Sequence, residues 1–355
     1  MRISHLGPLL IALSVTLPTP LCAQAPAQPD SGQMTIHVNV SARNGDPVEG
    51  LTKDDFTLTD NKHSEPITSL RALTGAQTGI VIVLDAVNLP YTEVSFARQQ
   101  LTQFFSSNPH LPQPTTLGVL LSDGLKMQPE FTTDGNALRS QLDHYSIGLR
   151  ELPRSAGFYG AEDRLELSLS MFRALVGQLP KEGMKRVIWI SPGWPLLSGP
   201  GIQLNTAQQN AIFSNVVAFT TELHRLQIVV DAVNPGGASE DVGRTNFYET
   251  FLHAPRNSRS VDLGELGLQV MAEQSGGLVL NGSNDIAGLI QRAMEQTKGG
   301  YELTFVPAPG EHENEYHELQ VKVRRPGLAV HTTAGYYARP VYPEFPHPVV
   351  SPHAN

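Results

Sequence analysis

Gly79-Ile80-Val81-Ile82-Val83-Leu84-Asp85 is a continuous apolar run that ends in a single carboxylate. Apolar runs of this length, without alternating polar residues, are typical of strands buried on both faces of a parallel sheet. Residues 94–105 follow, with apolar side chains at helical spacing. A buried strand followed by an amphipathic helix is the repeating unit of α/β folds, so this stretch predicts the first strand of a parallel sheet.

The same alternation of strand and helix continues to residue 298. Further buried strands are predicted over 117–121, 186–190, 227–233 and 277–280. Helices are predicted over 94–105, 136–142 (capped by Asp134), 162–179, 206–226, 263–274 and 285–297. Residues 78–298 are therefore expected to form one α/β domain, a doubly wound, mostly parallel sheet of Rossmann type. Its functional edge should lie at the carboxyl ends of the strands.

The segments on either side of this domain, residues 34–75 and 299–340, are β-rich and contain no helix-length periodic pattern. Residues 35–40, for example, alternate polar and apolar side chains, as a half-buried strand does. We expect the two segments to pack together as one small β-sandwich into which the α/β domain is inserted. Two separate small β units are the alternative.

The N-terminus carries the features of a secretory signal peptide over residues 1–25, with a basic start at Arg2 and small residues at its end. An uncleaved anchor and a lipoprotein modified at Cys22 are the alternatives. Residues 26–33 are expected to be a linker, and the proline-rich residues 341–355 a flexible tail. A secreted, periplasmic or cell-envelope protein is therefore predicted.

The composition of the 355 residues is that of a globular protein, with 40% hydrophobic and 17% charged residues. The formal charge of −9 argues against nucleic acid as a partner, because phosphate binding needs a basic face. No later apolar run is long enough to span a membrane, so no span is expected in the mature chain. The single cysteine excludes an intramolecular disulfide.

Several short motifs together resemble the von Willebrand factor A-related proteins abundant in acidobacteria. The likeness covers about residues 34–340, and seven weak motifs follow one another in the family's order. They are Leu51-Thr52-Lys53-Asp54-Asp55-Phe56, Val83-Leu84-Asp85-Ala86-Val87-Asn88, Ala97-Arg98-Gln99-Gln100-Leu101, Val187-Ile188-Trp189-Ile190-Ser191-Pro192-Gly193, Val230-Asp231-Ala232, Ala272-Glu273-Gln274-Ser275-Gly276-Gly277, and Arg324-Arg325-Pro326-Gly327 with Gly335-Tyr336-Tyr337. The resemblance implies an exported A-type α/β domain, flanked by β segments, with a binding role.

The resemblance also raises the question of a metal. Typical A domains hold a divalent cation through a first-strand motif D-x-S-x-S, with further oxygen ligands from later loops. Asp85 stands at the first position here, but Val87 and Leu89 replace the two serines. The later loop reads Ser191-Pro192-Gly193 and lacks its aspartate. We therefore predict that Asp85 is the remnant of a vestigial metal site and that no cofactor binds. A Mg²⁺-dependent adhesin that uses Asp85 is the alternative.

Polar residues are expected to meet at the carboxyl edge of the sheet and to contact a partner there. The candidates are Asp85, Asn88, Asp123, Ser191, Trp194 and Asp231. Asp123 with Gly124 has an alternative role in a turn. Trp194 either belongs to an exposed apolar patch or packs against a neighbouring loop. The loops over 88–92, 193–201 and 235–262 are the expected contact elements.

Three catalytic motifs are missing from the sequence. It contains no G-x-x-x-x-G-K-[ST] phosphate loop, and no dinucleotide fingerprint follows the first strand. Ser191 lacks the G-x-S-x-G setting of a hydrolase nucleophile. We therefore predict a binding protein rather than an enzyme, with an unknown protein or surface ligand as partner. An envelope enzyme of an unrecognised kind is the third reading.

Overall fold

A computed structural model describes residues 32–73, 77–128, 130–145, 158–195, 203–236, 246–298 and 300–339. Residues 33–355 cluster as one compact unit. The predicted signal peptide with Cys22, nearly all of the predicted linker and the predicted tail lie outside the described residues.

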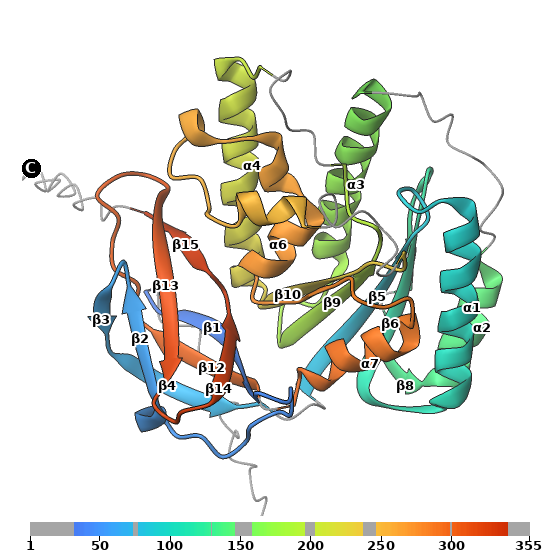
Figure 1. Ribbon diagram of the computed structural model, residues 1–355, viewed down its shortest axis with the longest axis horizontal. Helices are drawn as coiled ribbons and strands as arrows, with labels where there is room; N and C mark the ends of the chain where they lie inside the picture. Colours follow the sequence, from blue (N-terminus) through green and yellow to red (C-terminus); the bar gives the residue numbers. More distant parts are fainter. Residues whose placement is uncertain are drawn as a thin grey trace, which may run out of the picture. The chain divides into compact units, whose positions relative to one another are not determined.

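The predicted mostly parallel sheet is confirmed and has seven strands (Figure 1). They are β5 (Thr78–Asp85), β6 (His110–Leu121), β7 (Gly124–Met127), β8 (Thr132–Asp134), β9 (Met184–Ile190), β10 (Ile228–Val233) and β11 (Val279–Leu280). The strand order is β11-β10-β9-β5-β6-β7, and β8 also pairs with β6. Only β7 and β8 run antiparallel to their neighbour. These two short strands were not predicted, because each is brief and carries no buried apolar run.

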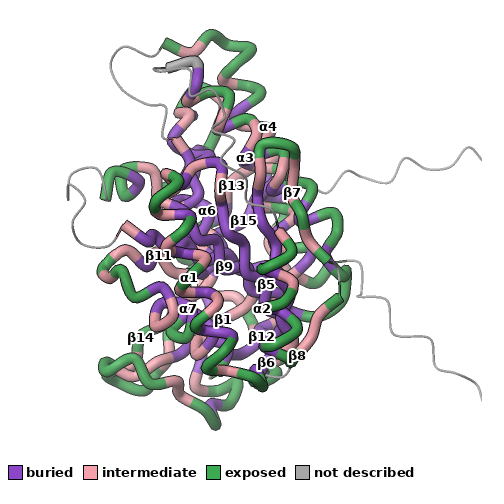
Figure 2. The backbone as a smooth tube through the Cα atoms, turned by 90° about the vertical axis from the view of Figure 1, so that its right-hand side faces the viewer, coloured by how far each residue is buried: buried purple, intermediate pink, exposed green. Residues whose placement is uncertain are grey.

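Helices cover both faces of this sheet. Successive residues of β5 therefore point alternately into two hydrophobic clusters, one on each face. Val81 and Val83 belong to one hydrophobic cluster, whereas Ile80 and Ile82 belong to another. The first cluster includes residues of α3 (Phe158–Gln178), α4 (Thr206–Arg225) and α6 (Leu268–Gln274). The second includes residues of α1 (Tyr91–Ser107), α2 (Gly135–His144) and α7 (Ile286–Glu295). Figure 2 shows β5 and β9 as buried between these layers.

Local capping chemistry sets where several of these helices begin. The Asp134 carboxylate accepts hydrogen bonds from the backbone N–H groups of Asn136 and Ala137, which confirms the predicted cap of α2. The single helix predicted over 263–274 is wrong. It is divided into a short 3-10 helix, η6 (Leu263–Leu266), and α6, because Gly267 between them is extended with ψ of 143°. Other 3-10 helices are η1 (Lys53–Asp55), η4 (Phe247–Phe251) and η5 (Ser258–Ser260).

The β-rich segments at the two ends of the chain pair with each other in two four-stranded sheets. The strands are β1 (Met34–Ala42), β2 (Phe56–Asp60), β3 (His63–Glu65), β4 (Ile67–Ala72), β12 (Gly300–Phe305), β13 (Glu315–Val323), β14 (Leu328–Thr332) and β15 (Gly335–Ala338). The orders are β14-β1-β12-β4 and β15-β13-β2-β3, so each sheet mixes strands from both ends. Figure 1 shows the blue strands beside the orange and red ones.

Both of these sheets, named here the flanking sheets, contribute to one hydrophobic cluster. Val38 and Leu303 of the first sheet and Leu58 and Val321 of the second are among its buried members. Because β1 pairs with β12 and β2 with β13, neither end of the chain can complete these sheets without the other. The strand β15 was not predicted as a strand, although its motif was noted.

Candidate functional site

The order in which strands are added to the seven-stranded sheet changes direction between the neighbouring strands β5 and β9. From β5 the chain passes to β6 on one side, and it later returns to β9 on the other. With β8 left out of the count, the order within this sheet is 3-2-1-4-5-6. Such a reversal opens a crevice at the carboxyl ends of the two central strands. Leu84 pairs with Ile190 there, so Asp85 and Ser191 end neighbouring strands. This place, named here the carboxyl edge, is the candidate site.

The Asp85 carboxylate is fully buried at the carboxyl edge and is surrounded by hydrogen-bond donors. Its Oδ1 accepts from the backbone N–H groups of Val87 at 3.1 Å and Asn88 at 3.0 Å. Its Oδ2 accepts from Asn88 Nδ2 at 2.8 Å, from Trp189 Nε1 at 3.1 Å and from Ser191 Oγ at 3.0 Å. Both oxygens are therefore engaged by the protein itself, and the carboxylate joins the turn after β5 to the end of β9.

A second layer of hydrogen bonds holds these donors in place. Asn88 Nδ2 also donates to Ser168 Oγ at 2.9 Å, and Ser168 in turn donates to the backbone carbonyl of Arg164 in α3. Ser191 Oγ accepts from the backbone N–H of Gly193 at 3.2 Å. The network thereby ties the turn after β5 to α3 and to the loop after β9.

The electrostatic state of Asp85 follows from two opposing influences. Burial raises the pKa of the Asp85 carboxyl, because a charged group loses its hydration there. The hydrogen bonds from Asn88, Trp189 and Ser191 act in the other direction, because they stabilise the ionised form. A carboxylate held in this way is a structural acceptor inside the protein.

The residues at the carboxyl edge do not fit a divalent cation. Mg²⁺ and Ca²⁺ take oxygen ligands that point lone pairs at the ion. Here both Asp85 oxygens already accept hydrogen bonds from N–H and O–H groups of the protein, so their lone pairs are directed to these donors. Val87 and Leu89, at the serine positions of the metal motif, are 4% and 2% exposed and pack in hydrophobic clusters. Among the described residues, no group of three or more His, Cys, Asp or Glu side chains is placed to hold a metal.

Asp231 is not brought together with Asp85. It lies inside β10, two residues before the strand ends, and forms an ion pair with Arg186 of β9 in which both side chains are fully buried. Its Oδ1 also accepts from the backbone N–H of Leu278 at 2.8 Å. Asp231 therefore links β9, β10 and the segment before β11. The expectation that Asp231 lies at the carboxyl edge is corrected, because its side chain is directed to Arg186, toward the amino end of β9.

Asp123 takes the turn role that was given as its alternative. It lies in the turn between β6 and β7, is exposed, and pairs with Lys126 at 3.2 Å. Gly124 has φ of 128°, a backbone conformation that L side chains rarely adopt. No contact joins Asp123 to the Asp85 network among the interactions of the described residues.

Trp194 does not form an exposed patch, so this expectation is also corrected. Its side chain is 2% exposed and belongs to an aromatic cluster with Phe172 at 5.7 Å and Trp189 at 5.5 Å between ring centroids. Trp194 therefore packs beneath the loop after β9, in agreement with the alternative that it packs against a neighbouring loop. Residues 196–201 of the expected contact loop lie outside the described residues.

Two members of the Asp85 network were not predicted. Trp189 was expected to be a core residue, which it is, but its indole N–H also donates to Asp85. Ser168 is fully buried in α3 although it is polar. The available signal was its position beside Leu165, Leu169 and Phe172, on the apolar face of the predicted helix.

The loop between β10 and α6 borders the same edge. Residues 237–245 lie outside the described residues, and η4 and η6 contact each other and α6. Gln269, in the first turn of α6, donates to the Pro192 carbonyl at 3.0 Å, which ties that end of α6 to the loop after β9. Residues at the ends of β5 and β9 and in the first turn of α6 are thus assembled into one region.

The comparisons with known proteins leave the family open. No family model and no curated protein matches the chain. Among solved structures, it is similar to an aerotolerance-related membrane protein from Bacteroides fragilis, with 15% identity, 62% of this chain, 99% of that chain and a TM-score of 0.31. It is also similar to proximal thread matrix protein 1 of the mussel byssus, with 10% identity, 74% of this chain, 50% of that chain and a TM-score of 0.32.

A third similar structure is the TFIIH p34 N-terminal domain, with 13% identity, 62% of this chain, 97% of that chain and a TM-score of 0.29. At these TM-scores the likenesses establish neither a family nor a function. Across the described residues, no helix has both the length and the apolar character that crossing a membrane requires.

Proposed function

We propose that the protein is an exported binding module of von Willebrand factor A type and not an enzyme, and that it contacts a protein or surface ligand at the carboxyl edge without a metal. The seven sequence motifs and the strand order 3-2-1-4-5-6 support the A-type assignment. The flanking sheets would form a small β-sandwich that carries the domain. The proposal rests on the Asp85 network, in which five protein donors already form hydrogen bonds to the two oxygens of the carboxylate.

Exposed aromatic side chains supply the contact surface in this proposal. Three large hydrophobic side chains are exposed among the described residues: Tyr91 at 51%, Phe247 at 36% and Val306 at 51%. Tyr91 begins α1, directly after the turn that Asp85 holds, and Phe247 begins η4 in the β10–α6 loop. Aromatic residues are enriched among those that contribute most to protein–protein affinity. The rigid Asp85 network would hold the Tyr91 turn in its binding conformation.

The binding role can be tested by site-specific photocrosslinking in cells that produce the protein naturally. A photoreactive amino acid would replace Tyr91 or Phe247. The matched control would replace Val306, which is as exposed as Tyr91 but follows β12 in the flanking sheets. We expect both edge positions to give an adduct with the same partner, unchanged by EDTA. Adducts at Val306 alone would contradict the proposal.

Metal independence is tested separately by thermal unfolding of the purified protein with EDTA, Mg²⁺, Mn²⁺ or Ca²⁺. A cation at 100 times its dissociation constant would stabilise the folded state by about 2.7 kcal/mol, which visibly raises the melting temperature. We expect no cation to raise it. A rise that Asp85→Ala abolishes would instead support the Mg²⁺-dependent adhesin.

A further inference from the structure

The flanking sheets meet the α/β domain through a polar face of β1. Strand β1 directs Ile36 and Val38 into the hydrophobic cluster that the two flanking sheets share. His37 and Asn39 lie on the opposite face, because side chains alternate along a strand. The walls of a cavity of about 20 Å³ combine His37 with the first residues of β9 and β10 and with the end of α4. This contact at the amino ends of the strands is named here the joint.

Three histidines from three elements gather at the joint. His37 of β1 and His224 of α4 line the same cavity. His331 of β14 is paired in register with Asn39, so it lies on the same face of the sheet as His37. The charge of Arg186 in β9 acts on both His37 and His331, which places this arginine close to the two rings.

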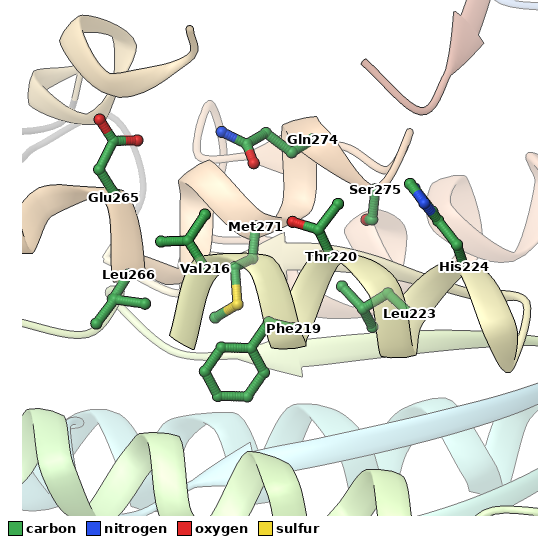
Figure 3. Close-up of a pocket in the computed structure, with 10 residues that line it drawn as sticks. All are labelled: Val216, Phe219, Thr220, Leu223, His224, Glu265, Leu266, Met271, Gln274 and Ser275. Carbon is green, nitrogen blue, oxygen red and sulfur yellow. The ribbon is translucent and has the colours of Figure 1, made fainter. Parts of the chain in front are cut away.

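His224 connects α4 with the turn between β14 and β15. Its Nε2 lies 2.6 Å from the hydroxyl oxygen of Thr333. The Thr333 hydroxyl donates its own hydrogen to the Gln274 carbonyl at 2.9 Å, so His224 Nε2 is the donor in the first bond. Figure 3 shows His224 toward the same end of α4 as Ser275 and away from Glu265. A further proton can therefore bind His224 only at Nδ1.

His37 has no protein group that would stabilise a charge on its ring. Both ring nitrogens are buried, and neither has a hydrogen-bond partner among the described residues. The carboxylate opposite it in the register belongs to Glu302, whose Oε2 accepts from Arg71 of β4. No hydrogen bond joins Glu302 Oε1 to His37, although Oε1 is also without a partner among the described residues. A charge on His37 would thus be buried and unpaired in the closed joint.

His331 faces charged groups of β9, β10 and α7. Burial lowers its pKa, the charges of Arg186 and Arg292 lower it further, and Asp231 acts in the opposite direction. Asp231 already forms an ion pair with Arg186, in which both side chains are fully buried. The two carboxylates at the joint are therefore each held by an arginine, and a protonated histidine would add positive charge beside them.

The closed joint keeps the other two histidines neutral at pH 7 as well. Burial, and to a smaller extent the charge of Arg186, lowers the pKa of His37 to about 3. Burial lowers the pKa of His224 to about 4. A histidine in water takes up its proton near pH 6.5. Between these values the closed joint excludes protons that the same side chains would bind in water.

Apolar contact at the joint is small. The hydrophobic cluster there contains Leu73, Met184 and Val229 only, whereas each of the other clusters has more than ten buried members. Opening the joint therefore costs less than unfolding either side of it. The rings of Phe213 in α4 and Tyr337 in β15, 5.8 Å apart between centroids, keep the flanking sheets attached elsewhere.

We propose that the joint is acid-sensitive: proton uptake by His37, His224 and His331 opens it in mildly acidic solution, while the α/β domain and the flanking sheets stay folded. An open joint exposes the three rings to water, so the open form binds more protons below about pH 6.5. The closed form is stable at pH 7 and loses its advantage as the pH falls. Each proton taken up raises the opening constant about tenfold per pH unit, and three raise it up to about 1,000-fold. The joint is separate from the carboxyl edge, so neither proposal depends on the other.

An NMR titration of the purified protein with ¹³C-labelled histidines tests this inference. Single His→Gln variants assign the signals. We expect His37, His224 and His331 to titrate together between about pH 4 and 6, with a Hill coefficient above about 2, because one opening step takes up several protons. The fluorescence of Trp189 and Trp194, which reports the core of the α/β domain, should stay unchanged over this range.

Two results would overturn the proposal. The first is independent titration of the three histidines, each with a Hill coefficient of about one, which is the behaviour of buried groups in a joint that stays closed. The second is a loss of the tryptophan signal in the same step, which would show that acid unfolds the whole protein.

Variants assign the cooperativity to its residues. His37→Leu removes one titrating ring and should lower the Hill coefficient of the other two histidines by about one. His331→Gln makes the same prediction from β14 and serves if His37→Leu does not fold. The matched control His63→Gln changes an exposed histidine of β3 and should leave the Hill coefficient unchanged. Full cooperativity in both His37→Leu and His331→Gln would also contradict the proposal.

Discussion

Replacing Asp85 with asparagine removes one acceptor oxygen from a site that contains five donors. With the amide nitrogen in the place of Oδ2, the donors of Asn88, Trp189 and Ser191 lose their acceptor. With the amide reversed, the backbone N–H groups of Val87 and Asn88 lose theirs. Each buried donor without an acceptor costs about 1–3 kcal/mol. The less costly orientation leaves two donors without an acceptor, so we expect Asp85→Asn to lower the free energy of unfolding by about 2 kcal/mol or more.

Urea-induced unfolding followed by tryptophan fluorescence suits this test, because the only two tryptophans of the chain lie at the site. Trp189 donates directly to Asp85, and Trp194 packs against Trp189. The matched control is Asp134→Asn at the start of α2, where asparagine is an equally good helix cap, so a change below about 0.5 kcal/mol is expected. A loss of less than about 1 kcal/mol for Asp85→Asn would refute the network as the interaction that holds the carboxyl edge together.

Three further predictions concern groups outside the carboxyl edge. Because the pKa of Glu265 is about 8 in the folded state and lies near 4.5 when unfolded, this residue's contribution to stability is full below pH 4.5 and is lost as the pH rises to 8. Glu265→Gln should therefore stabilise the protein by roughly 2–4 kcal/mol at pH 8 but hardly at pH 4.5, as measured by urea titrations at both pH values. Asp231→Ala leaves the fully buried Arg186 without its partner and should cost about 3–5 kcal/mol in the same assay, whereas pairing it with Arg186→Met should recover most of the loss. Gly277→Ala would place a Cβ 1.8 Å from the Val230 carbonyl oxygen, so we expect a lower melting temperature, and an unchanged one would contradict the close packing of these segments.

Periodicity in the sequence was sufficient to predict most of the α/β domain. The runs over 79–84 and 186–190 form neighbouring central strands of the sheet. Hydrophobic clusters cover both faces of the sheet, so side chains that point to either face can be apolar. The helix predicted over 263–274 is interrupted because Gly267 has an extended backbone, and the apolar pattern on both sides of Gly267 does not indicate this break. Strands β7 and β8 are short and lie at the edge of the sheet, where the pattern is weak.

The candidate site was predicted in part, because strand ends can be aligned from the sequence but side-chain directions cannot. Asp85, Asn88 and Ser191 were expected to meet, and hydrogen bonds join Asn88 and Ser191 to Asp85. Asp231 was misplaced because its partner Arg186 lies on another strand, 45 residues earlier. Glu265 Oε2, which has no hydrogen-bond partner among the described residues, was not predicted at all, since it lies where η6 and α6 pack against α4.

Residue type and spacing along the chain were enough to predict the central strands and most helices of the α/β domain, their order, and the loss of the serine ligands beside Asp85. The tertiary structure alone decided which polar groups are satisfied. Asp85 is saturated by donors from β9 and the turn after β5, while Glu265 Oε2 is buried with no hydrogen-bond partner among the described residues. The cost of burying a polar group depends on atoms that approach it in space. In this chain, those atoms come from residues far apart in the sequence.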